Sequence, residues 1–311
     1  RETDDFERPS HTWVYENTEL GTYVDYELLA VDGTYTEAVT GRDLYDLLGR
    51  STIDDYGLTY YVDGVVDTTI NAKNMIRGNN VEYNTTGNGV LTQVFVDHDE
   101  EEIVITSINT WLAQANADYN ESSETLSLKV FENNANGTTK IVDVADVPNI
   151  VDVTEDQFVL VNMSGKDTNS ANNLEVVKIS DVEIMSDVAI SKFSQSGGFF
   201  TKLTADGEEY SASAEAHYDD EVLNAYDQQL LTDMSYNVYL DQYGYAIGVD
   251  LFEGTLNYVF ITGYDRGTSH ISIKTAQAGA IFLDGTMKEI TVNVTNTNKN
   301  IDKVDGANSY F

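Results

Sequence analysis

The sequence predicts an all-β protein made of tandem β-sandwich domains of the immunoglobulin-like kind, with one or two short helices. Three observations predict this fold class. The stretch from Val94 to Val144 returns, in the same order of elements, from Val238 to Val294. Tyr, Val, Ile and Thr, which favour pleated and half-buried surfaces, are common. The 311 residues also suffice for two domains of ordinary size, each with its own core.

The repeat begins with strand-like runs and ends with a hairpin. The first copy reads VFVDHDEEEIVITSINTWLAQANAD and the second reads VYLDQYGYAIGVDLFEGTLNYVFITGYD, which aligns Asp97 with Asp241. The closing hairpins are KVFENNANGTTKIVDV, with an Asn-Gly turn, and AIFLDGTMKEITVNV, with an Asp-Gly turn. A β-rich unit that repeats after roughly 145 residues indicates a tandem chain, and such chains usually hold, span or bind.

The repeat and the prolines together suggest the domain organisation. We expect a first β-rich domain over residues 1–147, with the first repeat unit at about 90–147. A second domain is expected over residues 148–296, with the second unit at about 236–296, followed by a polar C-terminal arm, residues 297–311. The linker is placed at Val147-Pro148-Asn149, where one of only two prolines interrupts the pattern.

Local patterns predict the short helices and several strands. Gly41 to Gly49 reads as a short helix that Gly49 ends, and Asp219 to Leu231 reads as a second one. Leu58 to Ile70 predicts a hairpin, because an Asp-Gly pair separates two runs of β-branched and aromatic residues. Further strands are expected at Thr12 to Val24, Gln157 to Met163 and Leu174 to Ile184.

The charge balance narrows the range of partners. The chain has 53 acidic residues against 17 Lys and Arg, a formal net charge of −36, so nucleic acid is not an expected partner. Membrane insertion is not expected either, because no segment approaches the roughly 18 consecutive apolar residues of a spanning helix. There is no cysteine, so disulfides and thiolate metal sites play no part.

One acidic turn is a candidate cation site, for which calcium (Ca2+) is the most suitable ion. The ligands would come from a run between two predicted strands: Asp97, Asp99, Glu100, Glu101 and Glu102. The alternative is a solvated hairpin tip whose charges keep the strand edge from pairing with another strand. We favour this alternative, because loops are often polar without binding a ligand. The matching turn of the second copy, which starts at Asp241, has lost most of the charge.

No catalytic signature is present, and we expect no enzyme activity. The histidines His11, His98, His217 and His270 lack metal-binding spacings such as H-x-x-x-H. No nucleophile elbow, phosphate-binding loop or dinucleotide fingerprint occurs. Asp and Glu are so abundant that nominating a carboxylate pair would carry no information.

Several segments resemble a known family. The runs DDFERPSHTWVYENTELGTYV, VTGRDLYDLLG and GNGVLTQVFVD, with YNVYLDQYGYAIGV, NYVFITGYD and AIFLDGTMKEITVNV, are similar to surface-exposed regions of S-layer homology domain proteins of Clostridia and related Firmicutes. This resemblance implies an extracellular, cell-surface location and a structural or adhesive role. The wall-anchoring S-layer homology modules are not visible here, so any contact with cell-wall polymer would use regions outside this chain.

Two functions of different classes remain open. The first is a structural subunit of a surface layer or extracellular filament, which assembles with copies of itself through strand edges and terminal segments. Residues 297–311 would then serve as an intersubunit arm. The second is an adhesin-like module that binds glycans or host proteins through tyrosines: Tyr15, Tyr23, Tyr26, Tyr35, Tyr60, Tyr61, Tyr236, Tyr239, Tyr243 and Tyr245.

Overall fold

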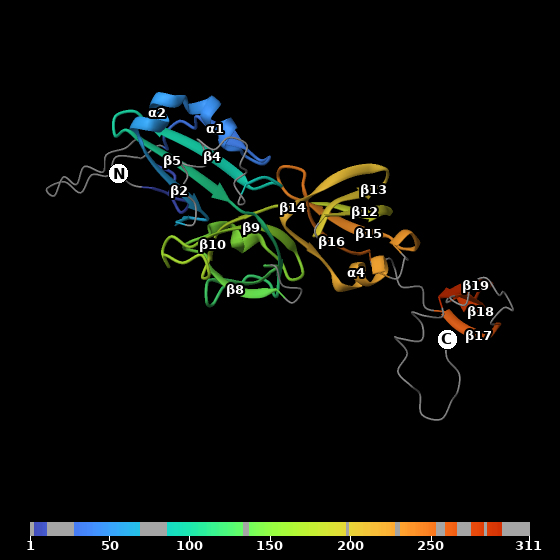
Figure 1. The fold of residues 1–311 in the computed structure, drawn as a ribbon. Coiled ribbons are helices and arrows are strands. Elements are labelled where there is room, and N and C mark those ends of the chain that lie inside the picture. The colour runs from blue at the N-terminus through green and yellow to red at the C-terminus, as the bar shows by residue number, and fades with distance from the viewer. Residues whose placement is uncertain are drawn as a thin grey trace. The chain divides into compact units, whose positions relative to one another are not determined.

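The computed structural model describes residues 3–10, 28–68, 86–132, 137–196, 199–227, 231–252, 259–265, 275–282 and 285–293. The chain divides into two compact units, Arg1–Phe252 and Glu253–Phe311, which differ from the predicted domain ranges. With 53% strand and 13% helix, the structure confirms the mainly β prediction (Figure 1). No helix in the described part of the chain is long and apolar enough to cross a bilayer.

The first sheet has the strand order β1-β4-β5-β2-β3, and two helices cover one face of it (Figure 1). Its core contains Leu44 and Ile53 from the helices and Val94, Ile103 and Ile105 from the strands. The elements are β1 (Gly33–Tyr35), α1 (Gly41–Leu48), α2 (Arg50–Asp55), β2 (Gly57–Val62), β3 (Val65–Val66), β4 (Leu91–Asp97) and β5 (Glu102–Ile108).

Local sequence explains why α1 and the β2–β3 hairpin form where they were predicted. Thr40 caps α1, because its side chain accepts from the Asp43 N–H while the Asp43 carboxylate accepts from the Thr40 N–H. The hairpin turns at Asp63 and Gly64, whose φ angles of 47° and 75° suit a type I′ turn. The strand predicted at Thr12 to Val24 lies outside the described residues.

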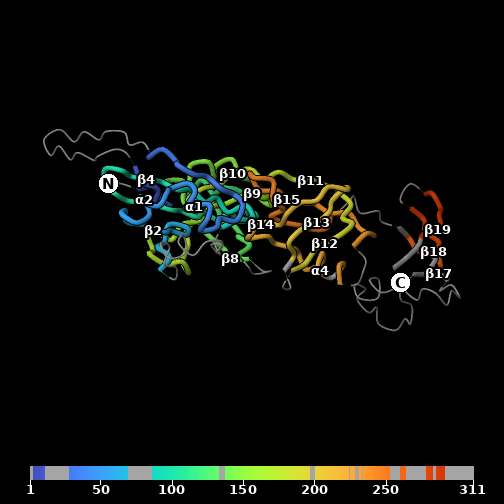
Figure 2. Tube along the Cα trace, turned by 45° about the horizontal axis from the view of Figure 1, so that its top comes forward, coloured from blue at the N-terminus to red at the C-terminus, as the bar shows by residue number. Residues whose placement is uncertain are grey.

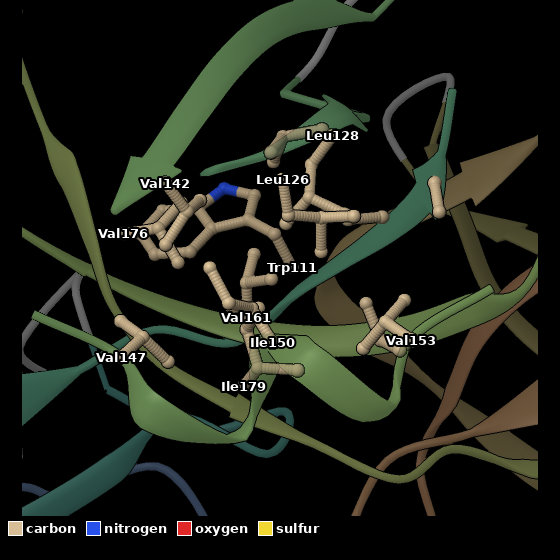
Figure 3. Close-up of a cluster of buried hydrophobic side chains, with 14 of the residues drawn as sticks. Trp111, Leu126, Leu128, Val142, Val147, Ile150, Val153, Val161, Val176 and Ile179 are labelled. Carbon is tan, nitrogen blue, oxygen red and sulfur yellow. The ribbon is translucent and has the colours of Figure 1, made fainter. Parts of the chain in front are cut away.

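The second sheet curls into a half-barrel with the strand order β10-β9-β6-β7-β8. Figure 3 shows Trp111, Leu126, Leu128 and Val161 pointing into its core. Alternate residues of β7 are buried, as expected for a strand with one face on a core. The elements are β6 (Trp111–Ala115), β7 (Thr125–Val130), β8 (Thr138–Asp143), the 3-10 helix η1 (Pro148–Asp152), β9 (Phe158–Ser164) and β10 (Glu175–Ser180).

The segment expected as an interdomain linker belongs to this core. Pro148 opens η1, a position at which proline loses no helical hydrogen bond, and Val147 and Ile150 are buried against β7 and its neighbours (Figure 3). The half-barrel takes β6, β7 and β8 from one side of residue 147 and β9 and β10 from the other. Val147-Pro148-Asn149 is therefore not a linker in this structure.

The third sheet has the order β11-β15-β16-β14-β13-β12. Its core includes Phe193, Leu203, Val222, Tyr236 and Val238. The second predicted helix is present as α4 (Asp220–Asp227). The other elements are β11 (Glu183–Val188), β12 (Ile190–Ser196), β13 (Phe199–Ala205), β14 (Glu208–Tyr218), η2 (Leu231–Asp233), β15 (Tyr236–Leu240) and β16 (Ala246–Leu251). In Figure 2 the trace of the first unit runs from the blue first sheet through the green half-barrel to these yellow and orange strands.

The second unit contains a three-stranded antiparallel sheet. Its order is β17-β18-β19, and β18 lies in the middle. Ala278 and Ala280 of β18 are buried, whereas Phe260 of β17 is exposed. The strands are β17 (Val259–Asp265), β18 (Thr275–Phe282) and β19 (Met287–Asn293).

Strand pairing extends the internal repeat beyond the part visible in the sequence. The orders β1-β4-β5-β2 and β11-β15-β16-β14 both consist of two antiparallel pairs followed by one parallel pair. Each copy then continues into three consecutive antiparallel strands, β6-β7-β8 and β17-β18-β19. The finer prediction of immunoglobulin-like sandwiches is not confirmed.

Candidate functional site

The acidic turn predicted as a cation site is the tip of the β4–β5 hairpin. Asp97 is buried, and its Oδ1 accepts hydrogen bonds from the backbone N–H groups of Asp99 at 2.9 Å and Glu100 at 3.1 Å. This geometry is an Asx-turn, in which an Asp side chain caps the backbone of the turn that follows it. Glu101 continues the turn with a φ of 53°, and its carbonyl accepts from the Gly57 N–H at 2.8 Å.

The acidic side chains of this turn do not converge. Asp99, Glu100 and Glu101 are exposed, and Glu102 pairs with Asp97 across the strands. Within the described residues, no three His, Cys, Asp or Glu side chains lie close enough together to hold a metal ion. The turn therefore has a clear structural role, and cation binding there stays a prediction.

The second copy contains the same cap at Asp241. Its Oδ1 accepts from the N–H groups of Tyr243 at 2.8 Å and Tyr245 at 2.9 Å, and its side chain is 3% exposed. The other oxygen, Oδ2, is buried against Gly89 and has no hydrogen-bond partner among the described residues. Burial raises the pKa of Asp241 to about 6, against the opposing effect of the backbone donors.

The half-barrel presents two strand edges to one groove. Along β10, β9, β6, β7 and β8, every neighbouring pair is antiparallel. The strand direction therefore reverses four times across the sheet, and the two outer strands, β8 and β10, run in the same direction. In the described part of the chain, no further strand pairs with the outer side of either one. The outer N–H and C=O groups of such edges are suited to pairing with another strand.

The groove between these edges has a volume of about 710 Å³. Two side chains donate to main-chain carbonyls of β10 or the residue before it, Lys140 from the groove and Asn149 from outside its lining. Lys140 Nζ of β8 donates to the Leu174 carbonyl at 2.7 Å, and Asn149 Nδ2 of η1 donates to the Ile179 carbonyl at 3.0 Å. Both donors supply hydrogen bonds to main-chain carbonyls near or within β10, as an adjacent strand would.

The groove is acidic, with one apolar lip. Ile141 of β8 is 65% exposed, although its neighbour Val142 is buried. Lys140 is the single cation among the lining residues, and it also lies 3.6 Å from Glu132. Five carboxylates line the groove, and all five residues are exposed: Asp5, Asp143, Asp146, Asp167 and Glu175.

A smaller pocket of about 210 Å³ lies between the half-barrel and the third sheet. His217 stacks on Phe131 with ring centroids 4.2 Å apart, and Phe158 packs on Tyr239 at 4.5 Å. Burial lowers the pKa of His217 and raises that of Tyr239, whose hydroxyl donates to Asp250 Oδ2 at 2.8 Å. The aromatic rings pack mainly against one another. The pocket therefore offers a ligand mainly polar groups, including the ring nitrogens of His217: Gln114, Lys129, His217 and Asp219.

Where the structure describes them, the tyrosines proposed as a binding face are mostly buried or half-buried. Tyr15, Tyr23 and Tyr26 lie outside the described residues. Four others are buried as packing residues and two are half-buried, whereas only Tyr243, at 36%, is exposed. The buried ones are Tyr60, Tyr236, Tyr239 and Tyr245, and the half-buried ones are Tyr35 and Tyr61.

Neither a protein-family model nor a curated protein sequence matches the chain. The resemblance to S-layer homology domain proteins stays a prediction. The groove residues Lys140 and Ile141 could not have been found from the sequence, because their location opposite β10 depends on the strand order. The Asp97 cap had a signal: an Asp at a strand end, directly before a polar turn.

Proposed function

We propose that this chain is a non-catalytic structural segment of a bacterial surface layer or extracellular filament. It would assemble with copies of itself through strand edges and terminal segments, as tandem β-domains that the sequence predicts to be immunoglobulin-like. The observation that supports this proposal most is the groove between β8 and β10, where two unpaired edges of the same sense face each other. Edges of this kind associate with other strands by main-chain hydrogen bonds.

The acidic surface fits an assembly that cations regulate. A net charge of −36 makes copies repel one another, and divalent cations or higher salt would screen this repulsion. The duplicated strand order also supports a mechanical role, since each copy repeats a sheet and a three-stranded extension. Within this proposal the location is extracellular, and any cell-wall contact uses regions outside this chain.

Electron microscopy and sedimentation of the full chain, with and without Ca2+, test the proposal. We expect ordered sheets or fibres that disappear when residues 297–311 are deleted, while circular dichroism shows that the domains stay folded. The matched control replaces the arm with a Gly/Ser sequence of equal length, which keeps the length and removes the side chains. Dispersed single particles under all conditions would contradict an assembly function, and assembly that survives both variants would contradict the role of the arm.

A second candidate function is an adhesin-like module for glycans. The pocket between Phe131, His217 and Tyr239 favours it, because it combines polar donors with a carboxylate in a small cavity. A glycan array, compared between the wild type and Lys129→Ala, tests this function. Binding that the substitution removes would support the module, and a blank array would contradict it.

A further inference from the structure

We propose that the groove between β8 and β10 receives residues 297–311 of a second copy, as a sixth strand that closes the half-barrel. This inference rests on the proposed function and names the surface that the arm would use. The sense of the strands, the charge of the groove and the length of the arm support it.

The directions of β8 and β10 allow a single inserted strand to pair with both edges. Because β8 and β10 run in the same direction, one strand of the opposite direction pairs antiparallel with both. Two strand spacings require roughly 9.6 Å between β8 and β10. Some Cα atoms of these strands lie within 8 Å of each other. The edges must therefore separate by about 2 Å where they come closest.

Lys140 acts as a latch against this separation. Its ammonium group donates to the Leu174 carbonyl at 2.7 Å, and its side chain reaches from β8 to the start of β10. Moving the edges apart breaks this hydrogen bond. A backbone N–H of the incoming strand can then donate to Leu174 in its place, so the carbonyl exchanges one donor for another.

Charge distinguishes the arm from residues 11–27, which include a predicted strand. The groove carries five exposed carboxylates against Lys140 alone, which disfavours an acidic strand. Residues 11–27 contain four acidic residues and neither Lys nor Arg. The arm carries Lys299 and Lys303 against two aspartates, which makes it neutral in a chain of net charge −36. The lysines can therefore pair with groove carboxylates.

The arm is long enough to enter the groove of another copy. β8 and β10 contain six residues each, so six of the fifteen arm residues cover the edges. The other nine span up to roughly 30 Å when extended. An arm can therefore enter the groove of another copy that lies within this distance.

Disulfide trapping tests the contact, because the chain contains no cysteine. One copy carries Ile141→Cys at the groove lip, and the other carries a single cysteine at Ile301, Val304 or Ser309, so that the scan samples three positions along the arm. The control is Ile184→Cys, a 45% exposed isoleucine on the edge strand β11. We expect at least one arm position to cross-link to residue 141 in fivefold or greater yield than to residue 184. Equal yields at all three positions would overturn the proposal.

Peptide binding tests the same contact without assembly. A fluorescein-labelled peptide of residues 297–311 should bind the full chain, and fluorescence anisotropy should show at least tenfold weaker binding to Asp143→Lys/Glu175→Lys. Lys140→Met should bind several-fold more tightly, because the latch is gone. A peptide that does not bind, or binds all three proteins equally, would overturn the proposal.

The results of these measurements distinguish a failure of the docking site from a failure of the proposed function. If deletion of the arm abolishes assembly while trapping and peptide binding both miss the groove, the assembly function stands and the docking site is wrong. If the peptide enters the groove but the chain forms no ordered assemblies, the docking site stands and the assembly function is wrong.

Discussion

The β4–β5 and β15–β16 hairpins have the same cap in different surroundings. Asp97 and Asp241 each end the first strand, and each accepts two backbone hydrogen bonds from the turn that follows. The acidic turn after Asp97 is open to solvent over His98 to Glu101. The Asp241 turn contacts two further segments: Tyr245 donates to Glu37 Oε1 at 2.6 Å in the loop after β1, and Gly89, just before β4, lies against Asp241 Oδ2.

The difference shows that the surroundings of a carboxylate, rather than its local hydrogen bonds, decide what it does in this protein. Both Asp side chains are buried and both turn tips are exposed, but the Asp241 cap also packs against Gly89, and burial raises the pKa of Asp241. The second turn has fewer acidic residues than the first, although its Gln242, Tyr243 and Gly244 are exposed as well. Substitutions at and around both caps test this comparison.

The largest effect is expected for Gly89→Ala. Gly89 has a φ of 83°, and an added Cβ would clash with Asp241 Oδ2 and lie 3.1 Å from Tyr245. Backbone strain and overpacking together should lower the free energy of unfolding by about 4 kcal/mol. Urea unfolding measures this loss.

The matched control for that variant is Gly244→Ala. Gly244 lies in the Asp241 turn with the same φ of 83°, but nothing lies within 4 Å of an added Cβ. It should lose only the backbone component, about 1–2 kcal/mol. Equal losses for the two variants would show that the junction around Asp241 is loose.

The next effect is the pH dependence of Asp241→Asn. Because the folded-state pKa is about 6 and the unfolded value is near 3.8, the native state holds the proton more tightly. The contribution of Asp241 to stability is therefore fully present below pH 4, and it is lost as the pH rises to about 6, by up to about 3 kcal/mol. The asparagine variant should lack this loss in urea unfolding between pH 4 and pH 7. A parallel pH profile for the two proteins would contradict the buried charge.

Asp63→Asn serves as a second reference for that experiment. Burial raises the pKa of Asp63 to about 7, and Asn109 donates to its carboxylate through both its backbone N–H and its Nδ2. The pH range over which Asp63 loses its contribution to stability therefore extends to about pH 7. Distinct windows for the two variants would assign each loss of stability to its own residue.

The sequence predicts what depends on neighbours along the chain. Gly49 ends α1 as predicted, the Asp63-Gly64 pair forms the turn of the β2–β3 hairpin, and the aligned Asp97 and Asp241 each cap a turn. Features that depend on distant pairing could not be predicted. Pro148 was interpreted as a break, although it starts a helix inside a core whose strands come from both sides of it.

The candidate site shows the same division. Nothing local distinguishes Lys140 or Ile141 from ordinary edge residues, and their importance appears only when β8 and β10 are seen to face each other. The parallel pairs β2·β5 and β14·β16 could not be predicted from the sequence either, because they join strands separated by many intervening residues. The pKa of Asp241 likewise depends on burial against Gly89, far away in the sequence.

A smaller effect is expected for Asp97→Ala. The substitution removes the acceptor of two backbone N–H groups at the edge of the sheet, where water can replace it in part. We expect a loss of about 1–2 kcal/mol in urea unfolding, with Asp97→Asn losing less because it keeps an acceptor oxygen. A loss as large as that of Gly89→Ala would show that the two turns are more alike than their surroundings suggest.

The smallest effect is expected when the exposed acids of the first turn are neutralised together, as Asp99→Asn, Glu100→Gln and Glu101→Gln. Their side chains are exposed and do not converge, so the free energy of unfolding should change by less than about 0.5 kcal/mol. Calorimetric titration with Ca2+ should then give the same result for the variant and the wild type. Calcium binding that the triple variant loses would instead establish a cation site at this turn, with Asp97 and Glu102 as its remaining carboxylates, and would give the first hairpin a function that the second one lacks.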